Sequence, residues 1–379
     1  MKVAFLFGAG ADSLFDLSCG NDFASKVVGI NGNLYDDAIK QFYAEMNDKE
    51  NFYPKYESGV NISKEKYYKE ALKKKWITEK REVNYKKDFE DSLQDEYSDM
   101  LKRNKGELDS LALEFPNYMG IMDGIFHTMI YPKALGPRYF WRTITYYWRA
   151  YLYLNDYSGN EHSTIWYMKN PFLAYKEMER RAEECKRKDS YYSILRKYSD
   201  ICTGIITTNY TPYAEVISEL NDNIAYIHGS FDWFESARDL TVLNTKEMID
   251  NKSFDDYFPF IFLQSGVKPI VHPIQIQEWS KALKYLDNAD SIIIVGYRAN
   301  CDDNHINSTI KYYMMKGKIV YYFEYKDTSS DNNGNVLENE KDVRNRFRIS
   351  DKEEGFNYVQ INRDTALQVF EDTIKILAK

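Results

Sequence analysis

Short uninterrupted apolar runs, each followed by a turn and an amphipathic segment, mark the two ends of this chain. Val3–Phe7 and Ser291–Val295 are the clearest runs, and unbroken apolar sequence of this length is typical of a strand buried on both faces of a parallel sheet. Weaker runs predict further strands at 205–208, 224–227, 259–263, 269–271, 318–323 and 358–361. Helical periodicity predicts helices at 22–28, 212–220, 277–286, 303–315 and 367–377. This alternation predicts an α/β fold, a Rossmann-like parallel sheet with helices on both faces.

The pattern changes between about residue 31 and residue 199. Few strand-like runs occur there, and apolar residues recur every four positions at Tyr85, Phe89, Leu93, Tyr97 and Leu101, which lines one face of a helix. An aromatic cluster at 139–153 fits the core of a helical subdomain better than a base-stacking surface. We therefore predict a Rossmann-like domain formed by 1–30 and 200–379, interrupted by a large α-helical insertion at 31–199. The polar stretch 327–335 is predicted to be a loop.

Composition narrows the class of protein. The chain has 379 residues, 44% of them hydrophobic, which is enough for one large or two ordinary domains with a substantial core. A formal net charge of −8 argues against a general nucleic-acid partner, and the mixed charges of 64–87 fit a solvated helix face. No run approaches the length of a membrane span, and the apolar start is too short for a secretion signal, so we expect a cytoplasmic protein without membrane contact.

The four cysteines are scattered and form no CxxC pair; they are Cys19, Cys185, Cys202 and Cys301. This spacing encodes neither a zinc ribbon nor a disulfide framework, and it fits a reducing compartment. We therefore predict no metal site. Four histidines are predicted to be mainly structural: His127, His162, His272 and His305. Contact with adenosine is a weaker alternative for His305, which lies in the segment 302–307 described below.

The first apolar run ends abruptly at Gly8-Ala9-Gly10. Glycine permits positive φ and removes the Cβ, so consecutive backbone N–H groups there can face a phosphate at the start of a helix. A plain tight turn is the alternative, because a full dinucleotide fingerprint needs a third glycine where this chain has Ser13. The glycine turn is therefore consistent with a nucleotide-binding site and equally with a plain tight turn.

Three later segments also follow predicted strands, where a doubly wound sheet presents its ligand-binding groups. They are 207–210 (TTNY), 227–230 (IHGS), and 295–297 (VGY), which leads into 302–307 (DDNHIN). Each segment alone is a weak signal. Together with the glycine turn, and in this order, they favour a nucleotide-binding site.

In that order the segments resemble the SIR2-like family, the sirtuin fold, and especially its bacterial defence-associated branch. GAGAD is similar to the family's GAGxS loop, ITTNYT to its TTNYD segment, IHGS to its HG, and VGYRANCDDNHIN to the GYSxxDxxIN of the defence branch. The matches cover about residues 1–30 and 200–325. The resemblance implies NAD as substrate, with Asn209 holding the ribose and a water molecule and His228 as general base. It implies contacts to NAD from Gly8, Ala9, Gly10, Ser13, Thr208, Gly229, Gly296, Tyr297 and Asp303.

Two residues depart from the family pattern. Asp12 stands where the family has Ser, and Thr211 stands where it has the carboxylate that pairs with the nicotinamide amide. A carboxylate at Asp12 is expected to point away from phosphate, because like charges a few ångströms apart repel. We expect Asp12 either to face the cationic nicotinamide ring as a third catalytic residue or to cap the following helix.

The resemblance implies an NAD glycohydrolase that cleaves the nicotinamide–ribose bond in anti-phage defence. A protein deacylase is disfavoured, because the zinc ribbon of those enzymes is missing. The alternative is a catalytically silent sensor that binds NAD or an ADP-ribose-type nucleotide and acts through partners. We also expect a homo-oligomer, and a partner protein from the same defence operon, such as an ATPase.

Overall fold

The computed structural model describes ten parts of the chain in enough detail to discuss. They are residues 1–17, 151, 154, 171–236, 241–251, 257–261, 272–300, 303–325, 340–350 and 353–379. The helices predicted at 22–28 and 85–101, most of the aromatic cluster at 139–153, the strand at 269–271 and the loop at 327–335 lie outside these residues.

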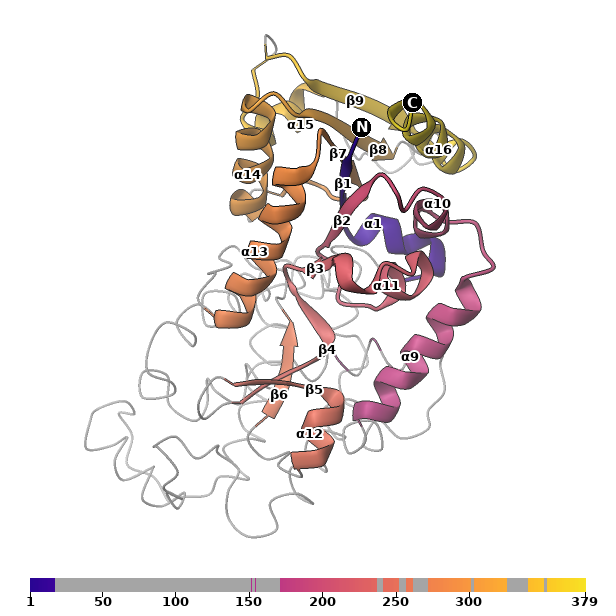
Figure 1. Ribbon diagram of the computed structural model, residues 1–379, viewed down its shortest axis with the longest axis vertical. Coiled ribbons are helices and arrows are strands. Elements are labelled where there is room, and N and C mark those ends of the chain that lie inside the picture. The colour runs from indigo at the N-terminus through magenta and orange to yellow at the C-terminus, as the bar shows by residue number, and fades with distance from the viewer. Residues whose placement is uncertain are drawn as a thin grey trace, which may run out of the picture. The chain divides into compact units, whose positions relative to one another are not determined.

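A six-stranded parallel sheet forms the centre of the first compact unit (Figure 1). The strands lie in the order β3-β2-β1-β7-β8-β9. Their bounds are β1 Val3–Phe7, β2 Cys202–Thr207, β3 Ile224–Tyr226, β7 Ser291–Val295, β8 Ile319–Tyr325 and β9 Phe356–Ile361. Numbered within the sheet this is the doubly wound order 3-2-1-4-5-6, so the predicted α/β Rossmann-like class is confirmed.

The register of the sheet brings the ends of its central strands into one row. Phe7 pairs with Thr207 on one side and with Val295 on the other, and Thr207 pairs in turn with Tyr226. Since all these strands are parallel, the segments that follow them leave the sheet at the same edge. The change of winding direction lies between β1 and β7, which is where a crevice forms in such sheets.

Helices cover both faces of this sheet (Figure 1). On one side lie α13 (Pro273–Asn288) and α14 (Asn304–Met315), and on the other α10 (Tyr191–Lys197) and α16 (Ala366–Leu377). Other helices are α1 (Ala9–Asp12), α9 (Pro171–Cys185), α11 (Tyr213–Ser218), α12 (Thr245–Asn251) and α15 (Glu340–Phe347), with 3-10 turns at Ser13–Phe15 and Asn221–Asn223. β1 and β7 are fully buried, as their unbroken apolar sequence predicts.

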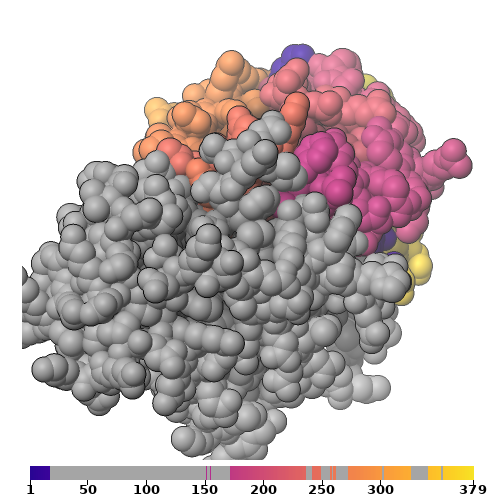
Figure 2. Space-filling model, turned by 90° about the horizontal axis from the view of Figure 1, so that it is seen from below, coloured from indigo at the N-terminus to yellow at the C-terminus, as the bar shows by residue number. Residues whose placement is uncertain are grey.

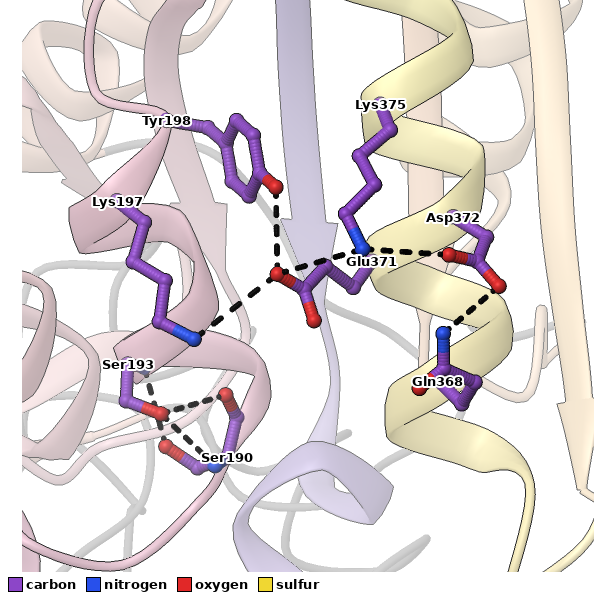
Figure 3. A network of polar contacts seen from close by, with 8 residues as sticks. All are labelled: Ser190, Ser193, Lys197, Tyr198, Gln368, Glu371, Asp372 and Lys375. Atoms are coloured by element: carbon purple, nitrogen blue, oxygen red, sulfur yellow. Dashed lines mark hydrogen bonds and ion pairs between the residues drawn. The ribbon is translucent and has the colours of Figure 1, made fainter.

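Helix α10 is fixed against the sheet and against α16, which matters because it carries a site residue. Ser190 and Ser193 form a reciprocal capping box at its start (Figure 3). Tyr191 meets the ring of Phe370 edge-on at 5.0 Å, and the Tyr198 hydroxyl donates to Glu371 at 3.2 Å. The ion pairs around Glu371 are exposed and add little, so the aromatic packing does most to hold α10 in place.

The bounds of the compact units differ from those of the predicted domains. The sheet unit holds Met1–Cys19, Glu179–Ser230 and Pro273–Lys379, and the other holds Gly20–Met178 and Phe231–His272. Residues 179–199 join the sheet unit because α10 packs its tyrosines on β1 and α16. Figure 2 shows surface residues of this unit from distant parts of the chain, coloured pink and orange, side by side.

The second unit contains a sheet of β5 (Val242–Asn244), β4 (Gly229–Ser236) and β6 (Tyr257–Ile261), in that order, although β4 begins in the sheet unit. β6 is the strand predicted at 259–263, and it pairs here and not in the Rossmann-like sheet. Tyr151 stacks on Phe231 with ring centroids 4.6 Å apart, and His272 Nε2 lies 3.6 Å from Glu235 Oε1. Among the residues that the structure describes, no helix has the length and apolar character needed to cross a membrane.

Candidate functional site

The loops that follow β1 and β7 meet at the change of winding direction with almost no space between their backbones. A Cβ on Gly8 would lie 2.5 Å from the carbonyl oxygen of Gly296, and a Cβ on Gly296 would lie 2.2 Å from the nitrogen of Ala11. Gly296 also has φ of +66°, which favours glycine. The sequence predicts that the backbone of the glycine turn lies close to another group, and this is confirmed. Within the protein, that group is the backbone of the loop after β7.

This contact uses backbone donors that the sequence analysis assigned to phosphate. Gly10 N–H donates to Gly296 O and Ala11 N–H donates to Gly8 O, both at 3.0 Å. The Ser13 hydroxyl donates to Gly10 O at 2.7 Å, and α1 is a single turn. A phosphate at this loop would thus have to accept hydrogen bonds from other donors, or the loop would have to rearrange.

Asp12 lies at the centre of a buried polar cluster that joins three parts of the chain. Its Oδ1 accepts a hydrogen bond from the Tyr192 hydroxyl at 2.5 Å, and its Oδ2 accepts one from the Thr211 hydroxyl at 2.6 Å. The two departures from the family pattern, Asp12 and Thr211, are therefore direct partners. The carboxylate of this pair comes from the segment after β1, and the hydroxyl comes from the segment after β2.

The surroundings of Asp12 control its charge. Burial raises its pKa to about 6, while the hydrogen bonds from Thr211, Tyr192 and Asn209 act in the opposite direction. Burial and the nearby Asp12 charge in turn raise the pKa of Tyr192 well above its usual range. Asp12 makes no side-chain capping bond to α1 or to the 3-10 turn that follows, so the helix-cap alternative is wrong.

Asn209 is anchored beside this cluster. Its Nδ2 donates to Gly8 O at 3.1 Å and lies 3.5 Å from the Tyr192 hydroxyl, while its backbone N–H donates to the Thr207 hydroxyl. The amide is thereby oriented by the β1 loop. The residue before Asn209 also contacts the end of β1, because the Thr208 N–H donates to Phe7 O at 3.0 Å.

His228 lies in a second buried cluster at the same edge of the sheet. It follows β3, and its Nε2 is 3.3 Å from Oδ1 of Asp303, which precedes α14. Asp303 occupies the N-cap position of α14, yet its side chain makes no capping bond. An Asp at an N-cap commonly makes such a bond, which stabilises the helix by about 1 kcal/mol. Here the carboxylate lies toward His228 instead. Gly229, with φ of +90°, turns the chain directly after His228.

Tyr297 and Asn307 hold the loop between β7 and α14. The Tyr297 hydroxyl donates to Asn307 Oδ1 at 2.8 Å, and Asn307 Nδ2 donates to the carbonyls of Ala299 and Asn300. Tyr297 is buried, and its carbonyl accepts from the Tyr322 hydroxyl. These two residues shape the loop that presents Asp303.

The structure thus brings the predicted residues to one edge of the sheet in two clusters. Five of the non-glycine residues among them are at least nine-tenths buried: Asp12, Asn209, His228, Tyr297 and Asp303. Tyr192 was missed because it lies in a segment predicted to belong to the insertion, and its tyrosine pair carries no motif. The helix start at Ser190 is the one local signal that was available.

Comparison with known proteins finds a distant structural likeness over about half of the chain. No protein-family model and no curated protein matches the sequence. A Sir2 enzyme of known structure is 14% identical, covering 56% of this chain and 81% of its own, with a TM-score of 0.31. A Sir2 homologue solved with NAD is 13% identical over 56% and 74%, with a TM-score of 0.33. Another, solved with 2′-O-acetyl ADP-ribose, is 14% identical over 56% and 76%, with a TM-score of 0.34.

Proposed function

We propose that this chain is an NAD glycohydrolase, which cleaves the bond between nicotinamide and ribose. The observation that carries the proposal is the pairing of Asp12 with Thr211, at 2.6 Å, beside Asn209. This places a buried carboxylate and an anchored amide at the carboxyl ends of β1 and β2. The resemblance of the surrounding segments to the SIR2-like family supplies NAD as the substrate to be tested.

The reaction requires little acid catalysis. Nicotinamide leaves NAD as a neutral group from a cationic ring, and the ribose passes through an oxocarbenium-like state. The protein must hold the ribose, stabilise the positive charge that develops on it, and position one water molecule. Asn209 suits the first and third tasks, because its carbonyl oxygen can accept from a ribose hydroxyl or a water while its Nδ2 donates to Gly8 O.

Asp12 suits the second task. An ionised carboxylate in a buried site stabilises a nearby cation more than it would in water. Its two oxygens each accept one hydroxyl hydrogen bond and have lone pairs left for another donor, such as the nicotinamide amide. The role that the family assigns to a carboxylate at position 211 is thus taken by Asp12, with Thr211 as its support.

His228 is proposed as the general base, with Asp303 as its positioning residue. A carboxylate beside Nε2 fixes the orientation of the imidazole and stabilises the imidazolium that forms when it accepts a proton. Asp303 was predicted to contact NAD. Its orientation toward His228 favours this supporting role instead.

Incubating the purified chain with NAD and following nicotinamide release tests the proposal directly. Release by the wild type that is lost in Asn209→Ala and in His228→Ala would support it. Absence of any release, with NAD still bound, would favour the silent sensor. That rival is supported by the hydrogen bonds already made by both Asp12 oxygens and by Gly10 N–H.

A role in anti-phage defence, with control by assembly, belongs to the same proposal. Unrestrained hydrolysis would exhaust the NAD of the cell that makes the protein. Activity is therefore expected to depend on a homo-oligomer or on a partner such as an ATPase. Measuring nicotinamide release against protein concentration, together with mass by light scattering, tests the oligomer.

A further inference from the structure

The His228 cluster contains a third potential metal ligand, His305, which has no role in the proposed reaction. His305 lies in the first turn of α14, two residues after Asp303. One ligand atom from each of His228, Asp303 and His305 can be chosen so that all three lie within 4.8 Å of one another. Among the described parts of the chain, this is the one place where three such side chains converge.

We propose that His228, Asp303 and His305 bind a divalent transition-metal ion of the Zn²⁺ or Co²⁺ type, and that its binding inhibits the chain. The inhibitory half rests on the proposed function, because it requires His228 to be the base. The binding half is independent of any activity.

The distances fit a shared ion with a small adjustment. Zinc binds imidazole nitrogen and carboxylate oxygen at roughly 2.0–2.2 Å, so two ligand atoms on one tetrahedral ion are at most about 3.6 Å apart. His228 Nε2 and Asp303 Oδ1, at 3.3 Å, already satisfy this limit. His305 has to come closer by on the order of 1 Å, which is feasible because it is only half-buried.

The chemistry of the three ligands selects the kind of ion. Two imidazoles and one carboxylate suit Zn²⁺, Co²⁺ or Fe²⁺, whereas Mg²⁺ and Ca²⁺ prefer oxygen ligands throughout. Three protein ligands also leave a position open for water, so the site is of the exchangeable kind and not a closed structural centre. The proposal departs from the prediction of no metal site, which rested on the scattered cysteines and took no account of a site built from histidines and a carboxylate.

One electrostatic term opposes the ion. The ligands lie at the N-terminus of α14, whose partial positive charge disfavours a cation. The Asp303 carboxylate outweighs this, because a full negative charge bound directly to the ion attracts it more strongly than the partial charge of the helix end repels it. The absence of a capping bond from Asp303 leaves its charge directed at the imidazole of His228 and not at the helix.

Occupancy would block the proposed base by a simple competition. A metal ion on His228 Nε2 leaves the ring proton of the neutral imidazole on Nδ1, so neither ring nitrogen keeps a lone pair that can accept a proton. Hydrolysis should therefore fall as the site fills.

Two variants separate this site from other zinc-binding groups. His305→Phe removes the ligand nitrogen and retains a ring against Trp279, whose centroid is 5.2 Å away. His272→Asn is the matched control, since it removes a buried imidazole that faces a carboxylate, Glu235, without belonging to a group of three. Circular dichroism checks that both variants are folded.

The test is calorimetric titration of the chelator-treated full-length chain with ZnCl₂, with CoCl₂ absorption as a second readout. We expect one ion per wild-type chain, a cobalt spectrum without thiolate charge transfer, and at least tenfold weaker binding in His305→Phe but not in His272→Asn. Binding that is absent in the wild type, or unchanged in folded His305→Phe, overturns the site.

Activity gives the second arm. Zinc should inhibit nicotinamide release by the wild type, and His305→Phe, measured against its own zinc-free rate, should need at least tenfold more zinc for the same fractional inhibition. Zinc that binds without inhibiting overturns the regulatory half alone. A chain that releases no nicotinamide but binds zinc through His305 overturns the proposed function and leaves the site intact.

Discussion

Two buried aspartates at the same edge of the sheet have opposite kinds of partner. Asp12 and Asp303 are each 4% exposed, yet Asp12 faces two neutral hydroxyls and Asp303 faces an imidazole. Neutral donors stabilise a carboxylate without cancelling its charge, so Asp12 retains a negative field for a cationic ligand. An imidazole can take up a proton beside its carboxylate. Under the proposed function, the first cluster would supply electrostatic stabilisation and the second would supply proton transfer.

The largest effect is expected where each cluster would touch the substrate. Asn209→Ala should abolish nicotinamide release, and His228→Ala should lower it by about 10²–10⁴-fold, the usual range for loss of a general base. Release is followed by chromatography, with thermal unfolding as the check on folding. Undiminished turnover in either folded variant would contradict its assignment. A variant that simply unfolds would indicate a structural role instead.

Removing the charge of Asp12 should separate binding from chemistry. Asp12→Asn keeps the shape of the side chain, so NAD should bind nearly as well while hydrolysis slows by on the order of 10²-fold. Calorimetry and single-turnover kinetics measure the two quantities. NAD binding that tightens strongly in a variant that never releases nicotinamide would place Asp12 against the phosphates and favour the sensor.

The pH profile sharpens the comparison further. If the reaction needs ionised Asp12, kcat/KM should fall on the acid side with a pKa near 6, since burial raises the Asp12 pKa to that value. Tyr192→Phe removes a hydrogen bond that lowers this pKa, so the acid limb should move upward by on the order of one unit. The ring packing on Phe7, at 4.9 Å, can remain.

Tyr191→Phe is the matched control for that variant. It removes a hydroxyl from the adjacent residue of α10, whose described contacts are to Phe7, Phe370 and Tyr325 and not to Asp12. The acid limb of the pH profile of kcat/KM for Tyr191→Phe should coincide with that of the wild type. Equal shifts in both variants would mean that Tyr192 acts through the packing of α10 and not through its hydrogen bond.

The fold was largely predictable from the sequence, because β1 and β7 are unbroken apolar runs and the strands alternate with helices. The meeting of Asn209, His228 and the glycine turn at one edge was predictable for the same reason. The hydrogen bond between Thr211 and Asp12 could not be predicted, because it depends on the directions in which side chains from two separate segments point. Tyr192 needed tertiary packing as well, because it reaches its cluster from a helix with no motif of its own. His305 lies in the DDNHIN segment, but its position near His228 depends on the packing of α14.

The smallest effect concerns the support of Asp12 by Thr211. Thr211→Val keeps the side-chain volume and removes the donor to Asp12 Oδ2, which should lower the free energy of unfolding by about 1 kcal/mol, whereas Thr211→Ser should change it by a few tenths. The pKa of Asp12 is higher in the folded chain, about 6 against 3.8, so its stabilising contribution is complete below pH 3.8 and is lost as pH rises through 6. The Thr211 hydroxyl stabilises the ionised form and limits that loss. The penalty of Thr211→Val in urea denaturation should therefore be larger at pH 7.5 than at about pH 5. A penalty independent of pH would show that Thr211 contributes packing alone, and would leave Asp12 with Tyr192 and Asn209 as its donors.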